Sequence, residues 1–295
     1  MPVSGRRPPW LRVRLGAGPG YTEVKSILRQ STLHTVCEEA RCPNIGECFG
    51  HHTATFLILG RVCTRNCRFC AIGSGKPDPL DQGEPERVAQ AVQALGLRHA
   101  VITSVTRDDL PDGGAGVFAA TVAKIRELVP TCSIELLVPD FQGSSSAIES
   151  VTRAKPDILN HNLETVPRLY RTVRPGASYR RSLELLRSAK MLDSTLLTKS
   201  GLMVGLGETW DEIERTMADL HDVSCDILTI GQYLQPSAKH LAVERYYEPA
   251  EFGRLREAGL RLGFRHVEAG ALVRSSYHAF EQIQQSVQRD ATDQA

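Results

Sequence analysis

Short apolar runs rich in β-branched residues recur along the chain and alternate with longer amphipathic stretches. The runs predict seven strands, at residues 53–59, 100–105, 133–138, 158–162, 200–205, 227–233 and 266–269. The stretches between them repeat apolar residues at helical spacing and predict helices that include residues 84–95, 178–191, 210–220 and 249–260. This alternation is typical of parallel strands joined by crossover helices.

Six or seven such units favour an α/β fold of the partial (β/α)6 TIM-barrel type over a flat doubly wound sheet. A doubly wound nucleotide-binding sheet usually carries a glycine fingerprint after its first strand, but Gly205-Leu-Gly207 lacks the third glycine. Gly75-Lys76 likewise lacks the earlier glycine of a P-loop. We therefore expect an irregular N-terminal extension at residues 1–50, a barrel at residues 51–270 and a C-terminal extension at residues 271–295.

Polar residues gather directly after the predicted strands. They are Cys63, Cys67 and Cys70 after the first strand, then residues 103–109, 160–164, 205–208 and 232–237. Singly, such residues also cap helices and form turns. In β/α barrels, however, the loops after the strands meet at one rim, where active sites lie. Their coincidence predicts a functional site at that rim.

The charge balance, with 35 basic and 34 acidic side chains, excludes a strongly basic footprint. Nucleic acid is therefore not expected as a partner. No stretch reaches the about 18 apolar residues that span a membrane, and residues 1–20 lack the apolar core of a signal peptide. We expect a cytoplasmic protein without a membrane partner, although an import sequence removed beforehand would leave no trace.

Six of the eight cysteines form two tight groups. The auxiliary trio has C-x4-C-x5-C spacing and the loop trio has C-x3-C-x2-C spacing; they are Cys37, Cys42 and Cys48, and Cys63, Cys67 and Cys70. Three thiolates can each bind one iron of a 4Fe-4S cluster and leave the fourth iron open. Structural zinc sites instead need four ligands around one ion. The spacing therefore favours two iron-sulfur clusters, with zinc as the main alternative.

Disulfides are a weaker alternative, because 295 residues can bury an ordinary core without crosslinks. Closely spaced cysteines would also close only short loops, which stabilise least. Cys132 and Cys225 have no cysteine or histidine at ligand spacing. We expect these two thiols to pack as small apolar groups.

The run Cys63-Thr-Arg-Asn-Cys67-Arg-Phe-Cys70 resembles the signature of the radical S-adenosylmethionine superfamily, which has this loop after the first strand of a β/α barrel. In that superfamily the cosubstrate chelates the open iron of the cluster. Its reductive cleavage gives a 5′-deoxyadenosyl radical that removes hydrogen from unactivated carbon. This explains why no acid–base triad is visible, since a general base contributes only about two to four orders of magnitude.

The auxiliary trio narrows the resemblance. Residues 33–48 are similar to the motif that holds an auxiliary 4Fe-4S cluster in the lipoyl synthase family. Residues 101–114, 160–167, 198–208 and Arg274-Ser-Ser-Tyr277 agree with the same family, and the likeness runs from about Trp10 to His278. In that family the second serine of the last motif, Ser276 here, is the remaining ligand of the auxiliary cluster. Ser275 is expected only to cap a helix or form a turn.

The resemblance implies insertion of two sulfur atoms, at the sixth and eighth carbons of an octanoyl group on a lysine of a lipoyl carrier domain. The auxiliary cluster is then the sulfur source, and one S-adenosylmethionine is consumed per carbon. The implied partners are octanoylated carrier domains, a reduced ferredoxin or flavodoxin as electron donor, and an iron-sulfur cluster carrier protein.

The resemblance also implies roles for individual residues. The loop trio holds the radical-generating cluster and, with Ser276, forms the catalytic set. Other residues are expected to bind S-adenosylmethionine: Thr103, Ser104 and Thr106 at the methionyl group, Asn162 and Glu164 at the ribose, and Arg174 at a carboxylate. Arg174 has a surface position or the substrate-lysine side as an alternative. We expect residues 107–109 to orient the substrate loop or to pair with Arg274.

Two rival functions fit part of the pattern. One is another radical sulfur-inserting enzyme, of the biotin synthase or methylthiotransferase kind, against which the Cys37 spacing and the Arg274 motif argue. The other is a zinc-stabilised binding module without catalysis, which metal content would separate. A homologue that keeps both clusters but lacks turnover is a third alternative.

Overall fold

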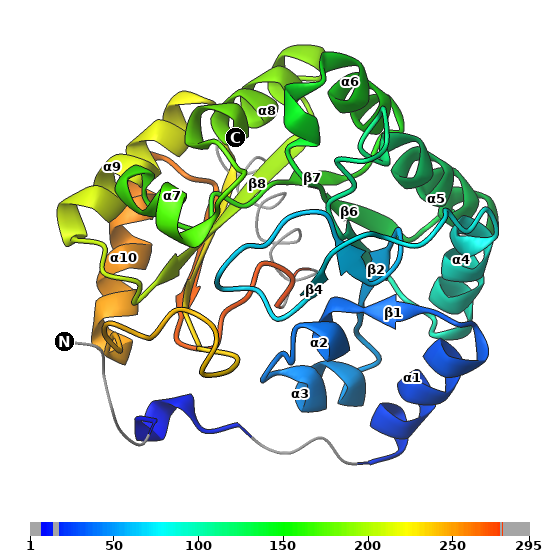
Figure 1. Cartoon of the computed structure of the whole chain (residues 1–295), viewed down its shortest axis with the longest axis horizontal. Helices are drawn as coiled ribbons and strands as arrows, with labels where there is room; N and C mark the ends of the chain where they lie inside the picture. Colours follow the sequence, from blue (N-terminus) through cyan, green and yellow to red (C-terminus); the bar gives the residue numbers. More distant parts are fainter. Residues whose placement is uncertain (1–6, 14–17, 278, 280–295) are drawn as a thin grey trace, which may run out of the picture.

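The computed structural model describes residues 7–13, 18–277 and 279, and within them the main sheet has eight strands. Their order is β1-β2-β5-β6-β7-β8-β9-β10 (Figure 1). β1 (His34–Thr35) pairs antiparallel with β2 (Thr55–Ile58), and all later neighbours are parallel. β1 and β10 lie at opposite edges of this order, so the barrel is open between them.

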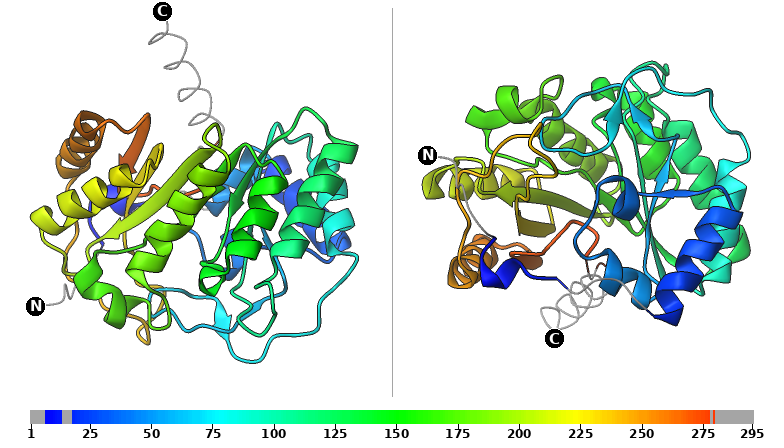
Figure 2. Two further views of the ribbon diagram at one scale, coloured as in Figure 1. Left: turned by 90° about the horizontal axis from the view of Figure 1, so that it is seen from above. Right: turned by 60° about the horizontal axis from the view of Figure 1, so that its bottom comes forward.

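Six strand–helix units follow one another, and their helices form the outer layer around the curved sheet (Figures 1 and 2). The remaining strands are β5 (His99–Ser104), β6 (Ser133–Leu137), β7 (Ile158–Asn160), β8 (Leu197–Val204), β9 (Ile227–Gln232) and β10 (His266–Gly270). The outer helices are α4 (Glu84–Ala94), α5 (Ala115–Leu128), α6 (Ser145–Arg153), α8 (Tyr179–Leu192), α9 (Trp210–Asp222) and α10 (Pro249–Leu262). The predicted partial barrel of the (β/α)6 type is confirmed, with β10 as a seventh parallel strand.

All seven predicted strands and all four predicted helices are present. Strands such as β2 and β9 are buried on both faces, and this explains why their apolar runs are continuous. Helix α9 begins where Thr209 and Glu212 form a capping box, and α10 ends at Gly263, whose positive φ favours glycine. Local chemistry therefore fixes much of the element pattern.

The expectation of an irregular N-terminal extension is wrong. This region contains α1 (Pro19–Gln30), α2 (Val36–Glu39) and α3 (Ile45–Gly50) besides β1. Val24 and Leu28 of α1 are buried, and the rings of Tyr21 and Phe49 lie 5.6 Å apart between α1 and α3. The pattern of α2 and α3 is weak in the sequence because these helices have only four and six residues and are ordered by packing, whereas α1, with twelve residues, carries a helical pattern that the prediction overlooked.

A buried ion pair crosses the sheet interior. Lys199 Nζ of β8 lies 3.0 Å from Glu135 Oε2 of β6, and both side chains are fully buried. Asn160 of β7 donates to the other oxygen of Glu135 at 2.7 Å. These contacts tie three neighbouring strands together beneath the barrel rim.

Two further observations complete the architecture. No helix in the described part of the chain is long and apolar enough to cross a membrane. Of the predicted C-terminal extension, residue 278 and residues 280–295 lie outside the described residues.

Candidate active site with two cysteine trios

A cavity of about 540 Å³ lies among the loops that follow the strands. All six clustered cysteines line this cavity, together with Ser276. So do the residues expected to bind S-adenosylmethionine: Thr103, Ser104, Thr106, Asn162, Glu164 and Arg174. The loop trio and the residues expected to bind S-adenosylmethionine lie at or after the ends of the parallel strands, as the sequence pattern predicted, whereas the auxiliary trio precedes β2. The structure therefore brings together every candidate site residue.

The loop trio begins at Cys63, the last residue of β3 (Val62–Cys63), which pairs with β4 (Gly73–Ser74). The backbone N–H groups of Arg65 and Thr106 donate to Cys63 Sγ at 3.4 and 3.3 Å. Burial, and then the adjacent thiols, raise the pKa of Cys70 to about 12. The three sulfur atoms are thus close enough to influence one another.

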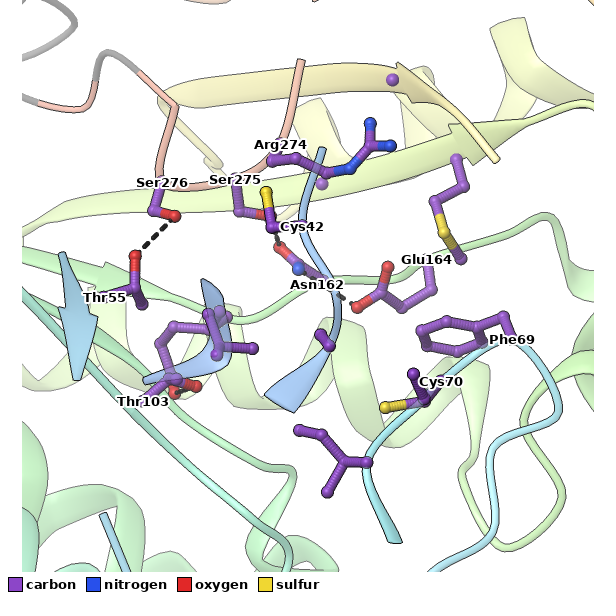
Figure 3. A pocket seen from close by; sticks show the side chains of 18 of the residues that line it. Cys42, Thr55, Phe69, Cys70, Thr103, Asn162, Glu164, Arg274, Ser275 and Ser276 are labelled. Carbon is purple, nitrogen blue, oxygen red and sulfur yellow. Dashed lines mark hydrogen bonds between the residues drawn. The ribbon is translucent and has the colours of Figure 1, made fainter. Parts of the chain in front are cut away.

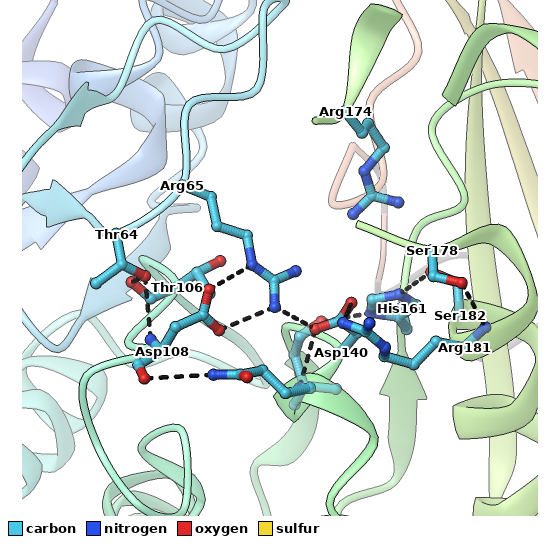
Figure 4. Close-up of polar contacts among 12 residues, drawn as sticks. Thr64, Arg65, Thr106, Asp108, Asp140, His161, Arg174, Ser178, Arg181 and Ser182 are labelled. Atoms are coloured by element: carbon cyan, nitrogen blue, oxygen red, sulfur yellow. Dashed lines mark hydrogen bonds and ion pairs between the residues drawn. The ribbon is translucent and has the colours of Figure 1, made fainter. Parts of the chain in front are cut away.

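Two contacts that the sequence did not indicate hold this loop. His240 Nε2 lies 3.0 Å from the carbonyl oxygen of Cys70, so this nitrogen donates, and His240 Nδ1 lies 2.9 Å from Ser237 Oγ. Arg65, inside the motif, makes two hydrogen bonds to Asp108, at 2.7 and 2.9 Å, and one to Asp140 at 2.6 Å (Figure 4). Burial would raise the pKa of Asp140, but Arg65 outweighs burial and leaves that pKa below its usual value. The cluster loop is therefore fixed to the loops after β5 and β6.

We expect Arg65→Met to lower the free energy of unfolding substantially. The Arg65 and Asp140 side chains are only 7% and 1% exposed, so the change leaves a buried carboxylate with Arg181, at 3.2 Å, and the backbone N–H of Gln142, at 3.1 Å. Breaking a buried pair in this way costs about 3–5 kcal/mol, and the remaining arginine places the expected loss toward the lower end. Urea unfolding of the metal-free protein measures it.

The matched control is Lys155→Met, which removes an ion pair to Asp193 whose lysine is 75% exposed. Exposed pairs contribute about 0–1 kcal/mol. Equal losses for the two variants would contradict the role of Arg65 as an anchor of the loop.

The auxiliary trio spans two short helices. Cys37 lies in α2, Cys48 lies in α3, and the N–H of Cys42 donates to the carbonyl of Cys37 at 3.0 Å. Burial, followed by the charges of the other two cysteines, raises the pKa of Cys48 to about 12. Asn44, between Cys42 and Cys48, donates from Nδ2 to the carbonyl of Leu272 at 2.7 Å. The trio is therefore compact and tied to the segment that carries Ser276.

Ser276 lies on the auxiliary side of the cavity, which is the side lined by Cys37, Cys42 and Cys48 (Figure 3). The hydroxyl of Thr55, at the start of β2, donates to Ser276 Oγ at 2.8 Å. Burial raises the pKa of Cys37 to about 12, and Thr55 opposes that rise. Thr55 thus lies beside both the candidate oxygen ligand and a thiol of the auxiliary trio, a role that nothing in the sequence signalled.

The other side of the cavity is rich in polar groups. Asn162 Nδ2 donates to Glu164 Oε1 at 3.1 Å, and Arg174 Nη1 donates to the carbonyls of Asn162 and Leu163 at 2.8 and 3.1 Å. Burial raises the pKa of Glu164, which Arg174 opposes. Ser104 Oγ and Arg174 Nε are buried without a hydrogen-bond partner among the described residues. Such groups suit a polar, zwitterionic cosubstrate.

The expected pairing of residues 107–109 with Arg274 needs correction. Arg107 pairs with Asp109 at 2.8 Å, while Asp108 pairs with Arg65, so this segment does not pair with Arg274. Arg107 and Asp109 are two residues apart in one loop and can meet locally. Asp108 instead meets Arg65, which lies between Cys63 and Cys67. Ser275 lies in a turn, as expected, and its Oγ also donates to Asn162 Oδ1 at 2.9 Å.

Other expectations hold. Arg174 is partly buried beside the cavity, which disagrees with a surface position. Cys132 and Cys225 are buried, as expected for small apolar groups.

His161 is buried, lies 2.8 Å from the Val138 carbonyl and 2.9 Å from Ser182 Oγ, and has its pKa lowered to about 4 by burial. It is therefore a neutral structural residue.

The donor sets fit iron-sulfur clusters. Within the described residues, no three Cys, His, Asp or Glu side chains are arranged as ligands of one metal ion. In a 4Fe-4S cluster each thiolate binds a different iron, so the ligands surround a larger group. Each trio offers three soft thiolates at the wall of one cavity, and the auxiliary trio adds the Ser276 oxygen.

Comparison with known proteins agrees with this chemistry. The model of the radical SAM superfamily matches residues 57–220, and the model of the N-terminal domain of lipoyl synthase of the same family matches residues 3–42. The lipoyl synthase of Rubrobacter xylanophilus is 63% identical over 94% of this chain and 87% of its own length. The lipoyl synthase of Staphylococcus carnosus is 56% identical over 95% of this chain and 91% of its own length.

Solved structures with low sequence identity share the fold. The maturase HydG of the [FeFe]-hydrogenase aligns with a TM-score of 0.56 at 12% identity, over 84% of this chain and 62% of its own. Methylornithine synthase aligns with a TM-score of 0.54 at 16% identity, over 83% of this chain and 73% of its own. With the matches above, the chain belongs to the lipoyl synthase family of the radical S-adenosylmethionine superfamily.

Proposed function

We propose that this protein completes the lipoyl group on its carrier. It inserts sulfur at the sixth and eighth carbons of an octanoyl chain that is amide-linked to a lysine of a lipoyl carrier domain. One observation carries the proposal: both cysteine trios and the Arg274–Tyr277 segment line a single cavity. An octanoyl chain in this cavity would lie between a site for S-adenosylmethionine and a source of sulfur. Identities of 56–63% to lipoyl synthases over nearly the whole chain support the same reaction.

The two trios hold clusters with different roles in this proposal. The loop trio, Cys63, Cys67 and Cys70, holds the resident cluster. The auxiliary trio, Cys37, Cys42 and Cys48, holds with Ser276 the cluster that is consumed as the sulfur-donating substrate. When bound, the resident cluster with S-adenosylmethionine supplies the one-electron chemistry needed to break an unactivated C–H bond. Apolar residues on the cavity wall, Leu202 and Met203 among them, suit an aliphatic chain.

The chain itself orients the reactants. We assign the methionyl group of S-adenosylmethionine to Thr103, Ser104 and Thr106, and its ribose to Asn162 and Glu164. Arg174, whose Nε has no partner among the described residues, is assigned to the carboxylate. Thr103 Oγ1 already donates to the Leu137 carbonyl at 2.9 Å, so it offers the cosubstrate only its acceptor capacity.

The partners follow from the reaction. An octanoylated carrier domain presents the substrate, a reduced ferredoxin or flavodoxin supplies electrons, and an iron-sulfur cluster carrier protein rebuilds the auxiliary cluster. Unoxidised thiols require a reducing compartment, and we place the reaction in the cytoplasm.

A single-turnover assay tests the function. Reconstituted protein is analysed anaerobically for iron and sulfide and is then given S-adenosylmethionine, a reductant and an octanoyl-lysyl peptide. We expect about eight irons per chain and a dithiolated peptide, because two 4Fe-4S clusters are bound. Cleavage of the cosubstrate without sulfur transfer by a chain with both clusters would contradict the proposal, and zinc in place of iron would contradict the metal assignment.

A further inference from the structure

The segment that follows β10 reaches both sides of the cavity. On the auxiliary side, its Leu272 carbonyl accepts from Asn44 at 2.7 Å and Ser276 Oγ accepts from Thr55 at 2.8 Å. On the other side, Ser275 Oγ donates to Asn162 Oδ1 at 2.9 Å. The neighbouring serines therefore have partners on opposite sides of the site (Figure 3).

Two glycines in adjacent strands make room for this segment. A Cβ atom at Gly201 of β8 would lie 2.7 Å from Asn162 Oδ1 and 2.9 Å from Ser275 Oγ. A Cβ atom at Gly231 of β9 would lie within 2.1 Å of the carbonyl oxygen of Val273. All three distances are too short for non-bonded atoms. A side chain at Gly231 would press on the backbone of the segment, and one at Gly201 would press on the side chains of Ser275 and Asn162. The two glycines therefore leave room for the contact between Ser275 and Asn162.

The contact fixes the orientation of the Asn162 amide. Its oxygen accepts from Ser275 while its nitrogen donates to Glu164 Oε1 at 3.1 Å. An amide can rotate by half a turn at little steric cost, and its hydrogen bonds decide which orientation is adopted. Without the Ser275 hydroxyl, the Asn162 oxygen loses its donor, and the hydrogen bond from its nitrogen to Glu164 is left to hold the amide alone.

The backbone under these side chains is fixed separately. Glu164 has a positive φ of 66° and bonds to β8 through Glu164 N to Gly201 O and Met203 N to Glu164 O, both at 2.9 Å. These bonds do not involve Ser275. Loss of its hydroxyl should therefore change side-chain orientation and leave the fold intact.

We propose that Ser275 is a positioning residue of the S-adenosylmethionine site, where its hydroxyl orients Asn162 and, through it, Glu164. The segment that brings Ser276 to the auxiliary trio thereby also completes the cosubstrate pocket. This inference rests on the proposed function, in which Asn162 and Glu164 bind the ribose.

The test is the dissociation constant for S-adenosylmethionine, measured anaerobically by equilibrium dialysis. Ser275→Ala should weaken binding about tenfold, because a half-buried acceptor that orients Asn162 is left without its donor. Iron content and melting temperature should stay at wild-type values. Gly201→Ala, which presses on the same contact from β8, should weaken binding in the same direction.

A double-mutant cycle separates positioning from a general effect. If Ser275 acts through Asn162, then Ser275→Ala adds nothing to the loss caused by Asn162→Ala. Thr229→Val is the matched control: Thr229 Oγ1 is equally close to a Cβ atom at Gly201 but donates to the Ser200 carbonyl at 3.4 Å. This control should bind the cosubstrate as the wild type does.

Three results would overturn the inference. They are a change of less than about twofold for Ser275→Ala, full additivity with Asn162→Ala, or weakening that appears only with loss of iron or of thermal stability. The proposed function fails differently, through wild-type protein that binds and cleaves the cosubstrate but transfers no sulfur.

Discussion

Replacement of Cys67 by alanine should abolish both the cleavage of S-adenosylmethionine and sulfur insertion. Cys67 is the middle member of the loop trio, and burial raises its thiol pKa despite the opposing charge of Arg174. Two remaining thiolates cannot hold three irons of the resident cluster, so iron should fall from about eight to about four per chain. Methionine release and dithiolated peptide, followed anaerobically by mass spectrometry, give both activities.

Cys132→Ala is the control for this variant. Cys132 is a fully buried thiol beside β6 and is not among the residues that line the cavity. Its loss should leave iron content and both activities unchanged. Methionine release by the Cys67 variant would show that the loop trio is not the site of the resident cluster.

Replacement of Cys42 by alanine should separate the two activities. Cys42 belongs to the auxiliary trio, where burial raises its pKa and Arg274 opposes that rise. Without it the sulfur-donating cluster should not assemble, and iron should again fall to about four per chain. Methionine release should continue because the loop trio is intact, while dithiolated peptide should disappear.

The Cys42 and Cys67 variants control each other, because each should lose one cluster but only the Cys42 variant should keep the cleavage of S-adenosylmethionine. Equal loss of cleavage in both would mean that the two cysteine trios act as one metal centre. Sulfur insertion by the Cys42 variant would contradict the auxiliary trio as the sulfur source.

Ser275 and Ser276 show why the chain carries two polar residues in succession here. Their side chains leave the backbone in different directions, so one segment can contact Thr55 and Asn162 at once. Arg274 lies beside them, near both Cys42 and Glu164, whose charges oppose the lowering of its pKa by burial. A few contacts of this one segment therefore connect the two sides of the cavity.

The strand and helix order was predictable because it depends on local chemistry. Apolar runs marked β2 and β5 to β10, and the capping residues Thr209 and Gly263 lie at helix ends. α2 and α3 were missed because such short helices gain their order from packing and not from an extended pattern. α1 was missed although it has twelve residues and its apolar Val24 and Leu28 have helical spacing.

The sequence by itself determined the composition of the site: six thiols in two spacings, an Arg-Ser-Ser-Tyr motif, and polar residues after each strand. Only the tertiary structure decided which side chains meet, as Arg65 does with Asp140 and Ser275 with Asn162. These partners lie 75 and 113 positions apart in the chain. The physical reason is that a hydrogen bond tolerates errors of only a few tenths of an ångström, and strand register, sheet curvature and two bare glycines set those positions together.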